Sequence, residues 1–179
     1  MRQDVQKDWA WTKQFEPQAS KILAEYLGSY VVRFVLSPLE KDQKEATDMY
    51  AIVTNGTVAL RIRRPKYTFR DLTIRAYRTN GYETELQKIL RGWARWYFYA
   101  WTDPLGKRIL EWIIVDLNDV RTTGLLLKAS RWDNHDGETG FVAVNLHELK
   151  RTNSLVATNL PPEFYEYPKE IVPDLPIPF

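Results

Sequence analysis

The strongest pattern in the chain is an alternation of apolar and polar residues on both sides of Asn55-Gly56. Asn-Gly is typical of a two-residue hairpin turn, because a type I′ turn needs a positive φ at both turn positions. With a loop of that length, Asp48 lies opposite Arg63. Tyr50 then lies opposite Arg61. One face of the hairpin is apolar and indicates core: Met49, Ala51, Val53, Val58, Leu60 and Ile62. The other face carries Asp48, Tyr50, Arg61 and Arg63, which indicates a functional or solvent-exposed surface.

A second alternating segment follows at residues 71–77, with Leu72, Ile74 and Ala76 on one side. We expect this strand to lie beside the hairpin in the same sheet. The polar side of this strand then continues the polar side of the hairpin, and together they form one charged surface. Its members are Asp48, Arg61, Arg63, Asp71, Thr73 and Arg75. Further basic residues surround this surface near Tyr67 and Phe69: Arg64, Lys66, Arg70 and Arg78.

Two segments carry helix signals. The first contains Pro17, which suits a first helical turn, and ends at Gly28. The second begins with Asn80 as N-cap and Glu83 at the capping-box position, and ends at Gly92. Its inward side is expected to hold Tyr82, Leu86, Ile89 and Leu90. Strands are predicted at 30–36, 95–101, 109–116 and 141–146, a short helix near 119–128, and loops at 37–46 and 132–140.

Composition bounds the class of protein. At 179 residues the chain can build one sizeable core, so we expect a single domain over residues 1–160. Residues 161–179 hold six of the ten prolines and are expected to form an extended tail. The absence of cysteine and the presence of only two histidines exclude disulfides and Cys/His zinc sites. No apolar stretch reaches the length of a membrane span, so we expect a cytoplasmic protein without a membrane partner.

The formal net charge is only +2, so a basic binding surface has to be local. The charged surface predicted around residues 61–75 has two interpretations. It could be a solvated sheet face whose cross-strand ion pairs are each worth less than about 1 kcal/mol. It could instead bind phosphate, because arginine grips phosphate with a planar fork. Basic residues interleaved with aromatics also suit single-stranded or branched nucleic acid.

The order of the predicted elements resembles the core of the PD-(D/E)XK nuclease superfamily. The whole chain also resembles an uncharacterised family of bacteriophage proteins, over most of residues 8 to 145. The matching motifs are Thr47-Asp48, Arg61-Ile-Arg-Arg64, Asp71-Leu-Thr-Ile-Arg75, Thr84-Glu-Leu-Gln-Lys-Ile89, Gly92-Trp93, Trp96-Tyr-Phe-Tyr99 and Asn134-His-Asp-Gly137. The resemblance implies an α/β fold with a central mixed β-sheet flanked by helices, and a phage setting in the cytoplasm of a host cell.

The superfamily motif places three residues of this chain at its catalytic positions. An aspartate opens the hairpin unit, and Asp48 fits that position. The acid-x-lysine pair of the next strand falls on Arg61 and Arg63, so the chain departs from the motif there. A nuclease of this kind needs at least two carboxylates to hold Mg²⁺ or Mn²⁺ beside the scissile phosphate. The resemblance therefore implies a displaced acid.

Three carboxylates are candidates for that acid: Glu85 first, then Asp71, then Glu25. Arg63 or Lys88 would take the role of the lysine, which stabilises charge on the attacking water and on the phosphorane. Glu85 and Lys88 also fit a plain interpretation, a solvent-facing pair three residues apart on one helix.

The first functional hypothesis is a phage DNA-processing protein, a Mg²⁺-dependent nuclease similar to Holliday-junction resolvases. The second is a catalytically inactive nuclease-like module that binds nucleic acid or a partner protein, and the third a phage structural or host-takeover protein. Expected partners are DNA and a second copy of the chain in a homodimer. The expected catalytic residues are Asp48, Arg63, Glu85 and Lys88, and the expected metal ligands Asp48, Asp71 and Glu85. The expected nucleic-acid contacts are Arg61, Arg63, Arg64, Lys66, Arg70 and Arg75.

Overall fold

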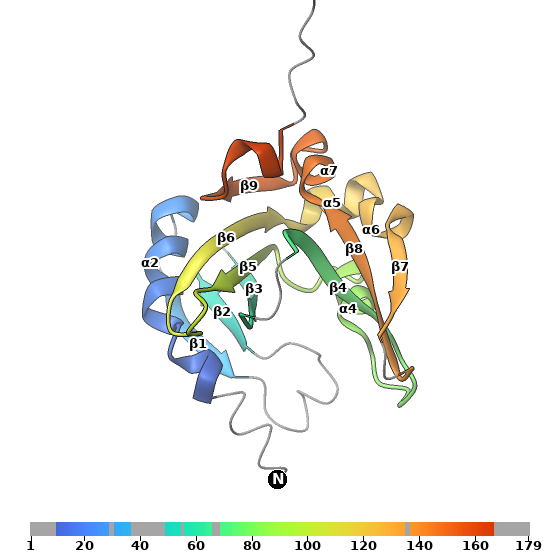
Figure 1. The fold of residues 1–179 in the computed structure, drawn as a ribbon, viewed down its shortest axis with the longest axis horizontal. Helices are drawn as coiled ribbons and strands as arrows, with labels where there is room; N and C mark the ends of the chain where they lie inside the picture. The colour runs from blue at the N-terminus through green and yellow to red at the C-terminus, as the bar shows by residue number, and fades with distance from the viewer. Residues whose placement is uncertain are drawn as a thin grey trace, which may run out of the picture.

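The computed structural model describes residues 10–28, 31–36, 49–54, 56–65, 69–134 and 137–166 (Figure 1). The strands among these residues form two sheets. The larger sheet has the order β1-β2-β3-β5-β6-β9, with β1 Val31–Leu36, β2 Met49–Val53, β3 Gly56–Arg63, β5 Trp96–Thr102, β6 Ile109–Asp116 and β9 Leu155–Thr158. The smaller sheet has the order β4-β8-β7, with β4 Asp71–Arg78, β8 Thr139–Asn145 and β7 Ser130–Asp133.

The larger sheet is mixed, because β3 and β5 run parallel while its other described pairs are antiparallel. Helices pack around both sheets: α2 Glu16–Leu27, α4 Glu85–Leu90, α5 Leu117–Thr123, α6 Leu125–Lys128, α7 Leu146–Arg151 and the 3₁₀ turn η1 Pro162–Phe164. The predicted α/β fold with a mixed central sheet and helices is confirmed at this level.

Side chains of β5 divide the core into two clusters. All seven residues of this strand are buried, and they alternate between the two faces of the larger sheet. Trp96, Phe98 and Ala100 pack on the face that α2 covers with Ala19 and Leu23. On the opposite face Tyr97, Tyr99 and Trp101 belong to the cluster shared with β4, β8 and helices α4 to α7. The larger sheet thus lies between α2 and the smaller sheet (Figure 1).

The hairpin of β2 and β3 has the predicted faces but a different register. Tyr50 pairs with Ala59 rather than Arg61, and Val53 pairs with Gly56. The shift is two residues, which leaves every side chain on its predicted face because strand side chains alternate with a period of two. Of the predicted apolar face, the described members are buried: Ala51, Val53, Val58, Leu60 and Ile62. Asp48 and Asn55 lie outside the described residues, so the pairing of Asp48 with Arg63 stays a prediction.

The expectation that β4 lies beside the hairpin is wrong. The neighbour of β3 is β5, and β4 pairs with β8 in the smaller sheet. The reason is that β5 is apolar on both faces, as a central strand of a sheet requires, whereas β4 alternates. Its predicted apolar face is confirmed nonetheless, since Leu72 and Ile74 are fully buried, and the register shifts only after Arg75. Segment 71–90, which holds β4 and α4, serves as the crossover between the parallel strands β3 and β5.

Helix α4 begins later than predicted. Its N-cap is Thr84, not Asn80, and the capping box pairs Thr84 with Gln87. Asn80 instead accepts a hydrogen bond from the backbone N–H of Tyr82 in the preceding turn. Tyr82 and Leu90, which were predicted to face inward, are exposed, while Leu86 and Ile89 are buried as predicted. The helix is consequently shorter, and its buried side starts with Glu85.

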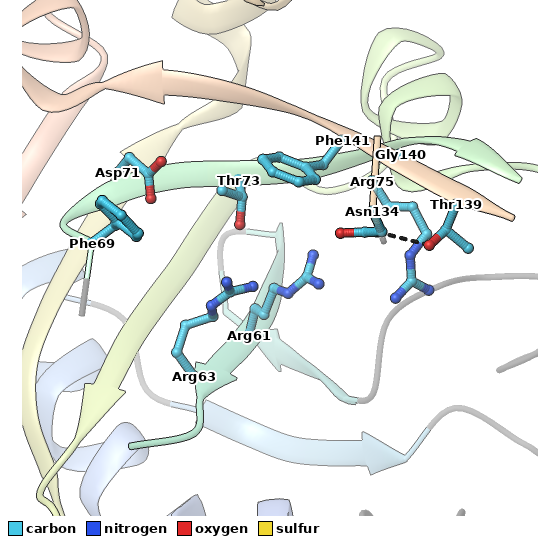
Figure 2. A pocket seen from close by; sticks show the side chains of 10 residues that line it. All are labelled: Arg61, Arg63, Phe69, Asp71, Thr73, Arg75, Asn134, Thr139, Gly140 and Phe141. Carbon is cyan, nitrogen blue, oxygen red and sulfur yellow. Dashed lines mark hydrogen bonds between the residues drawn. The ribbon is translucent and has the colours of Figure 1, made fainter. Parts of the chain in front are cut away.

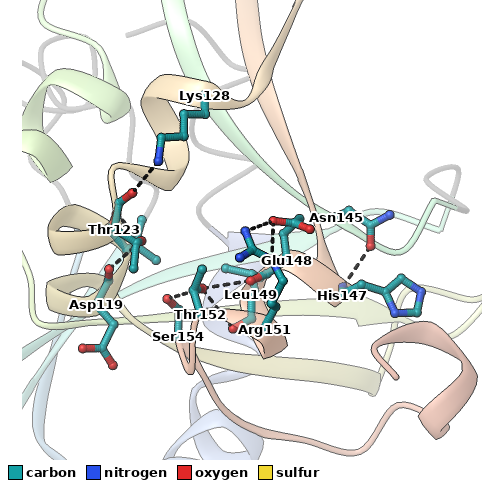
Figure 3. A network of polar contacts seen from close by, with 11 residues as sticks. Asp119, Thr123, Lys128, Asn145, His147, Glu148, Leu149, Arg151, Thr152 and Ser154 are labelled. Atoms are coloured by element: carbon teal, nitrogen blue, oxygen red, sulfur yellow. Dashed lines mark hydrogen bonds and ion pairs between the residues drawn. The ribbon is translucent and has the colours of Figure 1, made fainter. Parts of the chain in front are cut away.

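The C-terminal part contains elements that the pattern did not predict. Strand β7 lies partly inside the predicted loop 132–140, and α7 and β9 follow β8. The helix expected near 119–128 is divided at Gly124, whose φ of 64° ends α5. Local polar contacts close the end of α7: Thr152 donates a hydrogen bond to the carbonyl of Glu148 and shares another with the hydroxyl of Ser154 (Figure 3). Tyr165, at the start of the predicted tail, packs on the core.

Candidate functional site

A cavity of about 670 Å³ opens between β3 of the larger sheet and β4 and β8 of the smaller sheet (Figure 2). We call it the arginine pocket. Its lining consists of Arg61, Arg63, Phe69, Asp71, Thr73, Arg75, Asn134, Thr139, Gly140 and Phe141. Five of the six residues predicted for one charged sheet face are thus brought together: Arg61, Arg63, Asp71, Thr73 and Arg75. They meet across two facing sheets and not on adjacent strands.

Strand alternation explains how the arginines reach the pocket. Arg61 and Arg63 are two residues apart on β3, so they share the face that looks toward the smaller sheet. The guanidinium groups of both point from β3 toward β4 (Figure 2). The guanidinium carbon of Arg63 lies 5.8 Å from the ring centroid of Tyr99, the residue of β5 that pairs with Arg61. Arg75 reaches the same space from β4.

A buried carboxylate holds Arg61 in place. Glu85, only 1% exposed, accepts hydrogen bonds at Oε2 from Arg61 Nη1 at 2.9 Å and from the backbone N–H of Arg75 at 3.1 Å. Its Oε1 accepts a hydrogen bond from the hydroxyl of Tyr97 at 2.5 Å. Burial, and next the negative charge of Glu85, raise the pKa of Tyr97 well above its usual value, so the phenol stays protonated and donates. A buried carboxylate is tolerated only when it is paired and hydrogen-bonded in this way.

Glu85 and Lys88 are therefore not the solvent-facing pair of the plain interpretation. Both side chains are buried, and the ammonium of Lys88 lies 5.7 Å from the ring centroid of Trp93. Sequence spacing alone could not reveal this, because the partners of Glu85 come from β3, β4 and β5. Lys88 does not line the arginine pocket.

Asp71 and Thr73 form the polar side of the pocket on β4. Thr73 and Tyr99 share a hydrogen bond of 2.7 Å between their hydroxyl oxygens, which joins the two sheets. Burial raises the pKa of Asp71, while the positive charge of Arg63 acts in the opposite direction and is the smaller effect. Asp71 is thus a half-buried carboxyl that gains a proton more easily than an exposed one.

The other predicted site residues lie elsewhere. The guanidinium of Arg64 is 4.8 Å from the ring of Trp11, on the opposite side of β3 from the pocket. Arg70 forms an ion pair of 2.5 Å with Glu111, and Glu25 is exposed on α2, across the larger sheet. Asp48 and Lys66 lie outside the described residues, so their roles stay predictions.

Sequence reasoning did not assign four lining residues, Asn134, Thr139, Gly140 and Phe141, to the site. They reach the pocket because β8 pairs with β4, with Phe141 opposite Arg75. The amide of Asn134 donates a hydrogen bond of 2.7 Å to the hydroxyl of Thr139. The motif Asn134-His-Asp-Gly137 could have drawn attention to this turn, but only strand pairing places it beside the arginines.

The described carboxylates by themselves, without Asp48, do not form a Mg²⁺ or Mn²⁺ site. No group of three or more Asp, Glu or His side chains gathers in the described part of the chain in a way that could hold a metal ion. Glu85 already accepts hydrogen bonds at both oxygens, so a metal ion would have to displace protein donors. The metal roles of Asp48, Asp71 and Glu85 therefore stay predictions.

A smaller hollow of about 310 Å³ lies among α6, β8 and α7. Its charged residues are already engaged in local contacts. Arg151 forms an ion pair of 2.5 Å with Glu148, and Lys128 donates a hydrogen bond to the carbonyl of Thr123 at 3.3 Å. The arginine pocket, where charged residues from distant parts of the chain converge, is the stronger candidate.

Comparisons with protein-family models, with curated proteins and with solved structures give no match. The resemblance to a phage family and to a nuclease core therefore stays a prediction, as does a homodimer. No helix among the described residues is long and apolar enough to cross a lipid bilayer.

Proposed function

We propose that the chain is a nucleic-acid-binding module whose arginine pocket takes up phosphate groups. The observation that carries this proposal is the convergence of Arg61, Arg63 and Arg75, from two separate sheets, on one open cavity. Among the described residues of the lining, Asp71 is the single acidic one, so arginines outnumber carboxylates there. Arginine is suited to phosphate because its planar group forms two parallel hydrogen bonds with the oxygens.

The contacts of Glu85 distinguish this pocket from a solvated surface with ordinary ion pairs. An exposed ion pair has to order two flexible side chains and gains little. Arg61, in contrast, is fixed by a fully buried carboxylate that two further donors also hold. A guanidinium that is already ordered loses less entropy when a phosphate binds.

A second candidate function is the predicted metal-dependent nuclease with a PD-(D/E)XK core. One observation favours it: Asp71, a predicted metal ligand with a raised pKa, lines the same pocket as Arg63. A carboxyl of this kind could exchange a proton during hydrolysis, and Arg63 could stabilise negative charge on a phosphate. Asp48, Glu85 and Lys88 remain the other proposed catalytic residues.

The binding proposal is tested by fluorescence anisotropy with labelled single-stranded and duplex DNA over a range of salt concentrations. Log K should fall linearly with log salt, because bound cationic groups release counterions from the DNA. Arg63→Gln combined with Arg75→Gln should weaken binding to all sequences and flatten the slope by about one unit per lost contact.

Arg64→Gln is the matched control, because Arg64 lies on the opposite side of β3. It should leave both affinity and slope close to the wild-type values. Unchanged binding in the double variant would refute the proposal. For the nuclease, the same DNA is incubated with Mg²⁺ or Mn²⁺: cleavage that Asp48→Ala or Asp71→Asn abolishes would support it, and absence of cleavage in the wild type would contradict it.

A further inference from the structure

One exposed aromatic side chain lines the arginine pocket, and another lines the hollow next to it. Phe69 lines the pocket just before β4 and is 80% exposed. Trp132, on β7, is 57% exposed. Large aromatic residues are among the side chains that gain most from burial, so two of them at the surface beside a charged pocket indicate a contact surface.

Strand register connects Trp132 to the pocket. Arg75 on β4 pairs with Phe141 on β8, and Phe141 pairs with Trp132 on β7. Directly paired residues lie on the same face of a sheet, so these three form one row across the smaller sheet. Neighbouring strands are about 4.8 Å apart, which places Trp132 roughly 10 Å from β4 along this row.

A second hollow continues the surface beyond the pocket. It measures about 440 Å³, is lined by Tyr77, Arg131 and Trp132, and shares Gly140 and Phe141 with the arginine pocket. Gly140 is required where these strands meet, because a Cβ there would lie 2.9 Å from the carbonyl oxygen of Trp132. The smaller sheet can therefore bring β7 and its tryptophan close to the pocket only with glycine at this position.

We infer that the ligand of this surface is single-stranded nucleic acid, an inference that rests on the proposed function. Phosphates occupy the arginine pocket, and bases stack on Phe69 at one end and on Phe141 and Trp132 at the other. In a duplex the faces of the bases are covered by neighbouring bases, whereas a single strand exposes them to aromatic side chains.

The dimensions agree with a short stretch of single strand. Phe69 and Arg75 are six positions apart along β4 and the segment just before it, a length of roughly 20 Å, and the row to Trp132 adds about 10 Å. A path of about 30 Å accommodates several nucleotides, within the range of about 4–16 nucleotides that single-strand-binding folds occupy. Arginines between the aromatics distinguish this path from a contiguous apolar patch of the kind that binds proteins.

The inference is tested with an oligothymidylate of about 12 nucleotides and a duplex of the same length, a probe size within the range of single-strand sites. Phe69→Ala and Trp132→Ala should each weaken binding of the single strand about fivefold or more. Binding of the duplex should stay unchanged, and so should the salt slope for the single strand, because no phosphate contact is removed. Circular dichroism and thermal melting show whether the variants remain folded.

Tyr82→Ala is the matched control, since Tyr82 is an exposed aromatic that lines neither hollow. It should bind like wild type. The inference is overturned if Trp132→Ala loses the same affinity for single strand and duplex, or if neither aromatic variant loses affinity for the single strand. The proposed phosphate pocket still stands in that case if the arginine double variant binds DNA more weakly than wild type. A wild type that binds neither probe in a salt-dependent manner would overturn the proposed function itself.

Discussion

Replacement of Glu85 by Gln tests whether this buried carboxylate organises the pocket. The change removes the negative charge opposite Arg61 while it preserves the size of the side chain. One carbonyl oxygen remains and can still accept from Arg61 or from the backbone N–H of Arg75. The new amide group faces the hydroxyl of Tyr97, which then has to accept a hydrogen bond instead of donating one.

The expected cost follows from burial and from the remaining contacts. Removal of one partner of a buried ion pair costs about 3–5 kcal/mol when the other charge remains buried and unpaired. The Arg61 side chain is 21% exposed, so its guanidinium can turn toward solvent in the pocket. We therefore expect Glu85→Gln to lower the free energy of unfolding by about 2–3 kcal/mol. For a domain of this size that corresponds to a fall in Tm of about 4–12 °C.

Urea unfolding followed by circular dichroism measures this difference. Glu83→Gln serves as the control, because Glu83 pairs with Arg91 at the surface and its loss should cost less than about 1 kcal/mol. A double-mutant cycle with Arg61→Met isolates the pairwise contribution. The reasoning is refuted if Glu85→Gln costs no more than Glu83→Gln, or if the effects of Glu85→Gln and Arg61→Met are simply additive.

Two further predictions concern β4 and α4. The pKa of Asp71 is raised in the folded protein. Between the usual aspartate pKa and the raised value, the folded state therefore binds more protons than the unfolded state. As pH rises through that window, the contribution of Asp71 to wild-type stability falls. The stability of Asp71→Asn relative to wild type, measured by urea unfolding at several pH values, should therefore rise across the window and then level off; a flat or falling difference contradicts the assignment. Thr84→Ala should cost about 1 kcal/mol through loss of the N-cap, whereas Asn80→Ala should stay within about 0.5 kcal/mol. Equal costs for these two variants in thermal melting would show that the cap is assigned to the wrong residue.

Periodicity in the sequence determined which side of each strand is polar. The faces of β3 and β4 are as predicted, although the register of the hairpin is shifted and β4 lies in another sheet. Both errors leave the faces intact, because a shift of two residues preserves the alternation and the face of a strand does not depend on its neighbour. The arginines could therefore be identified as one group from the sequence, although not the geometry in which they meet.

Tertiary structure decided the partners of these side chains. Glu85 and Lys88 have the spacing of an exposed helical pair, and only the position of α4 against β3 and β5 buries Glu85 beside Arg61 and Tyr97. Phe141 enters the pocket through the pairing of β8 with β4, which joins segments more than sixty residues apart in the chain. Local patterns specify the direction in which a side chain points from its own strand or helix. The residue that it meets depends on long-range packing. The fully buried strand β5 occupies the place beside β3, so β4 faces the arginines from the second sheet.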